Sequence, residues 1–279
     1  MSKQMVAACA ATLVLDGQLD IQSPVRQWLP ELPAWSDDVR IRHLIHHTSG
    51  LPGDAALQQH IAANGQHQWD SPAVMRALQN CSTLQFRPGS AYQYCNAGYI
   101  CLVAVLERVT DTPFTDLALH QLFEPLHMRQ SLFCDHHAAV PAGAAAGNPD
   151  DEHGERWPLP LSLGDGGAWS TVNDLQRWND ALLPGGSIDG RVRALIHAPG
   201  RLEDGRPIDY AWGVRVSREN GVLIHSHGGN WPGGWTAKAI RLPDLGVTIT
   251  ALANNGDVPS MIELTERILD RYTRAPAPS

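Results

Sequence analysis

The chain has 279 residues, 43% hydrophobic and 18% charged, and a formal net charge of −8. It is long enough for one large domain or for two subdomains that share a cleft. The negative charge argues against nucleic acid or an anionic membrane surface as a partner. No apolar run is long enough for a transmembrane segment, and no signal peptide is visible; compartment and oligomeric state stay open.

The first segment, QMVAACAATLVLDGQLD, predicts a helix. Its apolar residues fall densely along 5–15, which is typical of a buried helix. Lys3 stands at the start of this helix, where a buried ammonium would have to be paired or lose its proton. From these residues alone, a cap at Ser2 and a solvated Lys3 would be the simpler interpretation.

Several shorter elements follow. Residues 18–35 are punctuated by proline and predict an irregular connector. Ile41, Leu44 and Ile45 mark a short helix, and Gly50 suits a left-handed position that ends it. Ser71 and Pro72 predict a helix through about Leu78, with Ser71 as its cap.

The middle of the chain predicts further helices and one long loop. Asn96 is placed to cap an apolar helix over residues 99–109, and Pro113 begins another. Residues 135–165 predict a long loop, which in a compact domain is more often functional than idle. Ser170 or Thr171 caps the helix after it.

The C-terminal part changes character. Two alternating runs joined at 219–221 predict a hairpin, and a second hairpin turns at 243–246. An amphipathic helix over 260–274 closes the chain. We therefore expect an α+β fold, mainly helix and loop over about 1–200 and antiparallel sheet plus a helix over about 201–279.

Histidines and cysteines give little sign of a metal. His43 and His47 are four residues apart, a spacing that would put them on one face of a helix, but the HExxH pattern is absent. The cysteines show no paired spacing, so neither a disulfide framework nor a Cys-x-x-Cys site is expected. They are Cys9, Cys81, Cys95, Cys101 and Cys134.

Five segments together resemble a known family. They are RHLIHHTSGLPG, FRPGSAYQYCNAGY, LFEPLHM, GDGGAWSTVNDLQRW and HGGNWPGGW, in this order. Each is weak alone, but their order is similar to that in the serine β-lactamase and penicillin-binding-protein superfamily. The closest similarity is to its class C-like branch of esterases, D-aminopeptidases and D-stereospecific peptidases. The resemblance implies one β-lactamase/transpeptidase-like domain over 1–279.

The resemblance implies acyl transfer by an activated serine. In the family motif S-x-x-K the lysine activates the serine one helical turn before it, and Lys3 matches that lysine. Tyr94 and Asn96 match the Tyr-x-Asn motif, which implies that Tyr94 passes a proton to the leaving group and Asn96 positions lysine and substrate. His227, Gly228 and Gly229 resemble the His-x-Gly form of the third motif, beside the oxyanion hole.

Structural roles are open for the same residues. Tyr94 could be a core tyrosine and Asn96 a helix cap, while His227 could be an ordinary strand residue. The combined order of the motifs favours the family interpretation.

The chain departs from the family at its start. The serine of S-x-x-K would stand one position before Met1, and Ser2 would face another side of the helix. We expect a truncated chain that lacks the nucleophile, the preceding helix and the first strands, with an inactive hydrolase as the result. Such a chain would have an exposed sheet edge and poor solubility.

The implied substrates are small molecules with an amide or ester bond. A neutral histidine holds a carboxylate less firmly than a lysine does, which favours an esterase or D-peptidase over a dedicated β-lactamase. No metal or organic cofactor is implied. The alternative is a catalytically inactive ligand-binding member of the same fold; an α/β-hydrolase is excluded because no G-x-S-x-G motif occurs.

Overall fold

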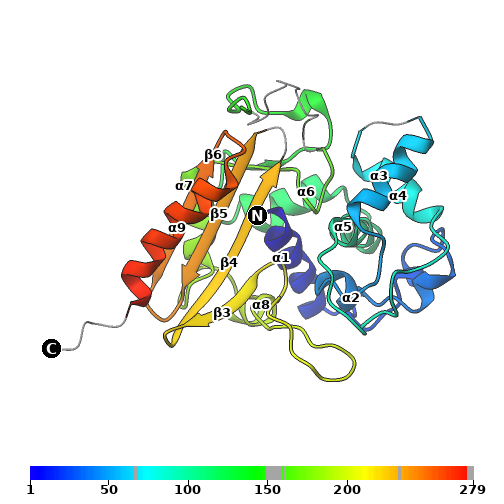
Figure 1. Ribbon diagram of the computed structural model, residues 1–279, viewed down its shortest axis with the longest axis horizontal. Helices are drawn as coiled ribbons and strands as arrows, with labels where there is room; N and C mark the ends of the chain where they lie inside the picture. Colours follow the sequence, from blue (N-terminus) through cyan, green and yellow to red (C-terminus); the bar gives the residue numbers. More distant parts are fainter. Residues whose placement is uncertain (66–67, 149–158, 160, 232–233, 275–279) are drawn as a thin grey trace.

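The computed structural model describes residues 1–65, 68–148, 159, 161–231 and 234–274. Its centre is an antiparallel sheet in the order β3-β4-β5-β6, with helix α9 on one face and helices α1, α7 and α8 toward the other (Figure 1). The strands are β3 (Arg215–Glu219), β4 (Val222–Trp231), β5 (Trp235–Leu242) and β6 (Val247–Ala253). The expected α+β fold class is confirmed.

Helices and short strands make up the rest. The α-helices are α1 (Ser2–Leu15), α2 (Ile41–Ile45), α3 (Asp54–Ala63), α4 (Ser71–Gln79), α5 (Asn96–Thr110), α6 (Phe114–Ala118), α7 (Val172–Ala181), α8 (Gly190–Ile196) and α9 (Val258–Thr273). The short elements are η1 (Val25–Gln27), η2 (Ala34–Asp37), the π-helical η3 (Leu119–Phe123), η4 (His137–Ala139), and the paired strands β1 (Leu132–Phe133) and β2 (Ala168–Trp169). No described helix is long and apolar enough to cross a membrane.

The register of the sheet decides which side chains face the helical body. Ile240 pairs with Ile249, and both pack in one apolar cluster with Leu269 of α9. Because side chains alternate between the two faces of a strand, Arg241 points the other way, toward α7. His225 lies opposite Arg241, and His227 stands two residues further along the same face of β4.

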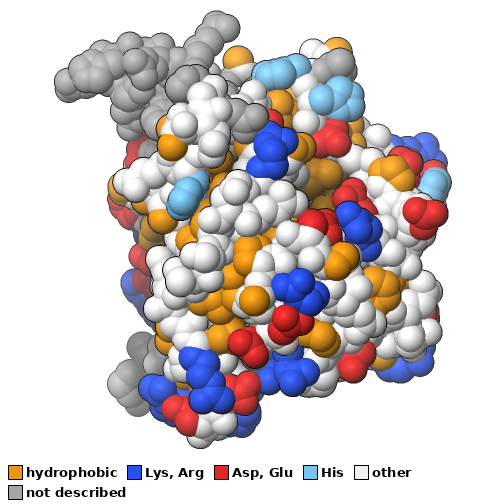
Figure 2. Space-filling model, turned by 90° about the vertical axis from the view of Figure 1, so that its right-hand side faces the viewer, with side chains coloured by type: hydrophobic (Ala, Val, Ile, Leu, Met, Phe, Trp, Pro, Cys, Tyr) orange, Lys and Arg blue, Asp and Glu red, His pale blue; other side chains and the backbone are white. Residues whose placement is uncertain are grey.

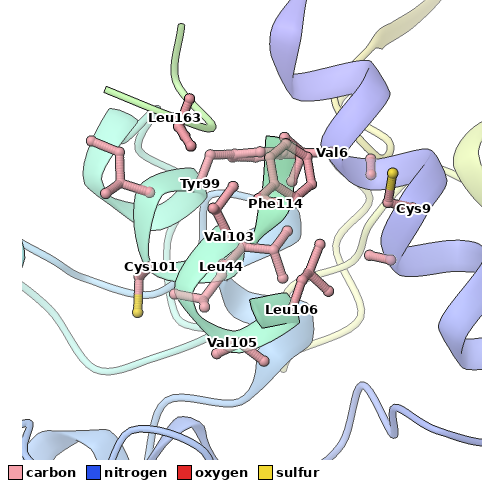
Figure 3. Packing of buried hydrophobic residues seen from close by; sticks show 14 of the residues in the cluster. Val6, Cys9, Leu44, Tyr99, Cys101, Val103, Val105, Leu106, Phe114 and Leu163 are labelled. Atoms are coloured by element: carbon pink, nitrogen blue, oxygen red, sulfur yellow. The ribbon is translucent and has the colours of Figure 1, made fainter. Parts of the chain in front are cut away.

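Helix α1 is buried along nearly its whole length, as its sequence predicts. Val6 and Cys9 are fully buried and lie beside Tyr99 and Leu106 of α5 and Phe114 of α6 (Figure 3). Small residues on α1 let its neighbours approach closely, and the dense packing gives the helix one fixed position. Its N-terminal end lies beside β4 (Figure 1), where a Cβ at Gly229 would stand 3.8 Å from the Met1 nitrogen.

Two predicted caps are wrong. Asp70, not Ser71, caps α4, because its Oδ1 accepts from the Ala73 N–H at 2.8 Å. The Ser71 hydroxyl accepts from the Leu163 N–H instead. Cys95 is the N-cap position of α5, and Asn96 is already helical. Thr171 does cap α7, through the Asp174 N–H.

Helix α2 ends earlier than Gly50 suggested. Its last helical residue is Ile45, and His47 follows with a left-handed φ of 56°. Gly50 also has a positive φ, of 75°, but it serves a different purpose. Its Cα faces the Phe86 carbonyl so closely that a Cβ would clash. The glycine therefore allows two chain segments to touch, rather than ending the helix.

The outer surfaces differ in character. Acidic and basic side chains are interspersed over the helical side (Figure 2), so the visible part of that face carries no field of one sign. The two outer strands of the sheet, β3 and β6, each pair with one neighbour only within the described sheet. Much of the predicted loop 135–165 lies outside the described residues, as do Pro232 and Gly233 of the last motif segment.

Candidate active site

Lys3 lies buried at the start of α1, with 2% of its surface exposed. Its Nζ donates to Asn96 Oδ1 at 2.7 Å and to the Asp165 carbonyl at 3.0 Å. The same nitrogen lies 5.0 Å from the centre of the Tyr94 ring. The solvated lysine of the simpler interpretation is therefore wrong: the ammonium is desolvated and its contacts come from α5 and the loop before β2.

The orientation of the Asn96 amide follows from its second partner. Asn96 Nδ2 donates to Asp54 Oδ2 at 2.6 Å. A carboxylate only accepts hydrogen bonds, so the amide nitrogen must face Asp54 and the oxygen must face Lys3. Asp54, the first residue of α3, thus fixes Asn96 as an acceptor for the ammonium. The helix-cap role considered for Asn96 does not occur.

Asp165 supports the lysine from the other side. Its carboxylate accepts from Trp69 Nε1 at 2.9 Å and from the Ser162 hydroxyl at 2.6 Å, while its carbonyl accepts from Lys3. Burial raises the pKa of Asp165, and the positive charge of Lys3 acts against this rise. Lys3, Asn96, Asp54 and Asp165 are called the lysine cluster below.

Tyr94 is not a core tyrosine, because 42% of its surface is exposed. It precedes α5 by two residues, and the centre of its ring lies 4.2 Å from the centre of the His47 ring and 5.0 Å from Lys3 Nζ. The phenol therefore borders both the buried ammonium and solvent. A group in this position can exchange protons with a ligand that enters from outside.

His227 is buried on the inner face of β4. The Tyr210 hydroxyl lies 3.4 Å from its Nε2, and the ring centres of His227 and Tyr94 are 6.4 Å apart. Burial, together with nearby positive charges that include Lys3, holds the pKa of His227 well below its usual range. The imidazole is therefore neutral at neutral pH.

The two glycines of the third motif continue β4 past His227. Gly228 lies opposite Lys238 and Gly229 opposite Ala237 on β5. A Cβ at Gly229 would stand 3.8 Å from the backbone nitrogen of Met1. The start of α1 therefore lies against the strand at Gly229. All six predicted site residues come from α1, the start of α5 and β4, and they surround one small region.

Ser2 points away from this region. Its hydroxyl accepts from the Ala168 N–H of β2 at 3.3 Å, and its side chain is buried. Lys3 is turned toward Asn96 instead. Adjacent helical residues thus face different neighbours, as the sequence argument expected.

His47 and Tyr210 belong to the site but were not selected from the sequence as site residues. His47 Nδ1 accepts from the Cys95 N–H at 3.2 Å, so a neutral ring carries its proton on Nε2. Burial and then Lys3 keep the pKa of His47 well below normal. Its ring centre lies 4.6 Å from that of Tyr210. Their only sequence signal was the position of His47 inside a motif segment.

The His43–His47 pair does not form a metal site in this geometry. Because α2 ends at Ile45, the two residues do not share a helix face. His43 Nε2 lies 3.5 Å from Glu203, whereas His47 lies among tyrosines. Within the described ranges, no group of three His, Cys, Asp or Glu residues is placed to hold a metal ion.

Known sequences similar to this chain include a penicillin-binding protein and D-aminopeptidases. Penicillin-binding protein 4* of Bacillus subtilis (strain 168) is 29% identical over 278 residues, covering 91% of this chain and 59% of the relative. A D-aminopeptidase of Gluconobacter oxydans (strain 621H) is 24% identical, covering 88% and 47%. The chain thus spans about half the length of these curated relatives.

Solved structures share the fold. The D-amino acid amidase from Ochrobactrum anthropi SV3 superimposes with a TM-score of 0.79 at 22% identity, over 97% of this chain and 84% of that one. The octameric penicillin-binding protein homologue from Pyrococcus abyssi gives 0.77 at 22% identity, over 98% and 65%. The Beta-lactamase family model matches residues 1–273. The chain therefore belongs to the Beta-lactamase family and has the β-lactamase/transpeptidase-like fold.

Proposed function

We propose that this protein is a serine hydrolase that cleaves amide or ester bonds of small molecules through an acyl-enzyme. One observation carries the proposal: Lys3 is desolvated and bonded to Asn96 at 2.7 Å, beside Tyr94. A lysine kept out of water can serve as a base toward a nearby hydroxyl. The family and its hydrolase relatives support this reaction class.

The nucleophile of this proposal is a serine in register with Lys3, directly before Met1. A residue added before Met1 would lie close to Gly229, because the Met1 nitrogen already lies near that glycine. Chain 1–279 alone then forms no acyl-enzyme, since Ser2 is engaged with β2. The roles are Lys3 as base toward the serine, Tyr94 as proton donor to the leaving group and Asn96 as the residue that orients lysine and substrate.

The third-motif strand would bind the carbonyl end of the substrate. In this proposal His227 shapes that end, and β4 beyond it offers glycines that permit close approach of a ligand to the backbone. Because His227 is neutral, it attracts a substrate carboxylate less than a lysine would. This favours D-amino-acid amides and peptides or neutral esters over penicillins, in agreement with the D-aminopeptidase relative.

The test compares three chains. They are 1–279, the same chain with serine placed directly before Met1 in a short leader, and a matched chain with alanine at that position. Each is treated with a fluorophosphonate and analysed by intact mass. We expect stoichiometric labelling of the serine chain only. If neither extended chain is labelled, the hydrolase proposal fails and the inactive ligand-binding alternative is favoured. If 1–279 is labelled on Ser2, the assignment of the nucleophile is wrong.

The role of His227 has a separate test in the serine-bearing chain. His227→Lys restores a fixed cation for a substrate carboxylate, and such a charged hydrogen bond is worth about 1–3 kcal/mol. We expect kcat/KM for a penicillin to rise relative to kcat/KM for a neutral p-nitrophenyl ester. An unchanged ratio would remove His227 from the third-motif position.

A further inference from the structure

A second buried cation, the guanidinium of Arg241, lies on the inner face of the sheet, away from the lysine cluster, beside the buried His225 and the partly exposed His197. Arg241 lies on β5, His225 opposite it on β4, and His197 just after α8; these three are called the arginine cluster. Arg241 is 1% exposed and His225 is 5% exposed. The His197 and His225 rings are stacked with their centres 3.9 Å apart.

The arginine cluster has few partners. Arg241 Nη1 donates to Asn179 Oδ1 of α7 at 2.8 Å, and this partner is a neutral amide. Three buried nitrogens of the cluster have no hydrogen-bond partner in the described structure: Arg241 Nε, His225 Nδ1 and His197 Nε2. Native proteins leave few buried polar atoms unsatisfied, so three of them in one cluster need a physical explanation.

Charge distinguishes an ion from a water here. Burial lowers the pKa of Arg241 to about 9, so the guanidinium still carries its charge at neutral pH. Arg241 makes no ion pair within the described residues. The negative charge of Asp244 acts on the pKa of His225, but the Asp244 side chain is 55% exposed and lies 3.8 Å from Arg218. A buried charge without a counter-charge is strongly unfavourable, and a neutral water leaves that charge uncompensated.

We propose that the arginine cluster binds one small inorganic monoanion of the size of chloride, held by the Arg241 guanidinium and by N–H groups of His225 and His197. The three nitrogens are closed to solvent, and a monatomic anion is the smallest group that can bring a negative charge to them. An imidazole can present an N–H on the required side by choice of tautomer. The ion supplies the negative charge that the surrounding side chains lack.

The first experiment uses chain 1–279 and does not depend on catalysis. Its melting temperature is measured in increasing sodium chloride, with sodium gluconate added to keep the ionic strength constant, because screening alone affects both salts alike. A ligand that binds only the folded state stabilises it by mass action. We expect a saturable rise of several degrees with chloride. No dependence on the anion at constant ionic strength would overturn the proposal.

A matched pair of variants locates the effect. Arg241→Gln should lose the chloride-dependent rise, whereas Arg267→Gln, which removes the same charge from the exposed side of α9, should keep it. An unchanged rise in Arg241→Gln would overturn the proposal. Crystals of the unaltered chain grown in bromide provide a measurement that needs no variant. An anomalous peak within hydrogen-bond distance of Arg241 Nε is expected; a water there, or bromide at the surface only, would overturn the site.

Discussion

The inner face of β4 carries two buried histidines, and their surroundings differ sharply. His227 lies near the lysine cluster, where the ammonium has two oxygen acceptors and each of those residues has further partners. His225 lies two residues away in the arginine cluster, where the acceptor of the guanidinium is one neutral amide and no described carboxylate pairs with it. Buried nitrogens without a hydrogen-bond partner occur in both places, His227 Nδ1 and His225 Nδ1 included, so the contrast is one of charge. Lys3 and Arg241 are buried to a similar degree, but the two positive charges are not compensated to the same degree.

The difference shows that burial alone does not identify a reactive site. In the lysine cluster the protein's own groups satisfy the ammonium, so Lys3 and its orienting residues are held in position without an added ion. In the arginine cluster the acceptor is one neutral amide oxygen, and no carboxylate among the described residues pairs with Arg241; a site of this kind suits an anion. The four predictions below test this contrast, from the largest expected effect to the smallest.

Replacing Lys3 should have the largest effect, in the chain that carries the serine. Lys3→Met removes the base, so kcat for an ester should fall about 100-fold or more with a smaller change in KM. Lys238→Met is the matched control, because Lys238 lies on the opposite face of β5, toward α9. A fall of similar size in both variants would mean that Lys3 has no special role in proton transfer.

Removing the acceptor of Lys3 should destabilise the fold. Asn96→Leu leaves the ammonium with only the Asp165 carbonyl, and the unpaired charge should lower the free energy of unfolding by about 2–4 kcal/mol. Urea denaturation measures this, with Asn173→Leu on the exposed side of α7 as control. A loss no larger than that of the control would show that solvent reaches Lys3 and that the lysine cluster is not self-sufficient.

The sequence predicted the elements better than their junctions. Both hairpins and the helices at α1, α7 and α9 were predicted because alternation and apolar periodicity are local signals. The caps at Ser71 and Asn96 were wrong because those side chains have partners far away in sequence, Leu163 and Lys3. A local rule cannot include a partner that only the fold brings near.

The same limit applies to the site. Lys3, Tyr94, Asn96 and His227 were selected by motif order, and the fold brings them together. Asp54 and Tyr210 were missed because nothing local to them signals that they support other residues. Asp165 was missed although it lies in the motif segment GDGGAWSTVNDLQRW, because the segment does not show that this residue contacts Lys3. Arg241 was missed for a different reason: its neighbours in sequence are apolar, and only the register with His225 reveals the cluster.

Replacing Arg241 by an apolar residue should have an effect that depends on the salt. Without chloride, Arg241→Met removes an uncompensated buried charge, and unfolding free energy should stay level or rise by about 1–2 kcal/mol. In saturating chloride the unaltered chain should have a higher free energy of unfolding than Arg241→Met. Urea denaturation in gluconate and in chloride measures both. A loss of several kcal/mol in gluconate would mean that the protein itself already compensates the guanidinium.

The smallest expected effect is on the loss of folding stability at acidic pH. Burial, helped by the positive charge of Arg241, lowers the pKa of His225 to about 4. The unfolded chain, with an ordinary histidine pKa near 6.5, therefore binds more protons between about pH 6.5 and 4, so stability falls as the pH is lowered through this window. One such group contributes at most about 1.4 kcal/mol per pH unit.

His225→Gln should remove this contribution and make the decline of melting temperature with acid shallower, in buffers free of chloride. The exposed His60→Gln is the control. His43 and His46 have pKa values lowered to about 4 by burial as well, so a residual slope is expected in every variant. An identical slope for His225→Gln and the unaltered chain would show that His225 takes up a proton as easily in the folded state as in the unfolded one. The arginine cluster would then already hold a negative charge strong enough to offset its burial.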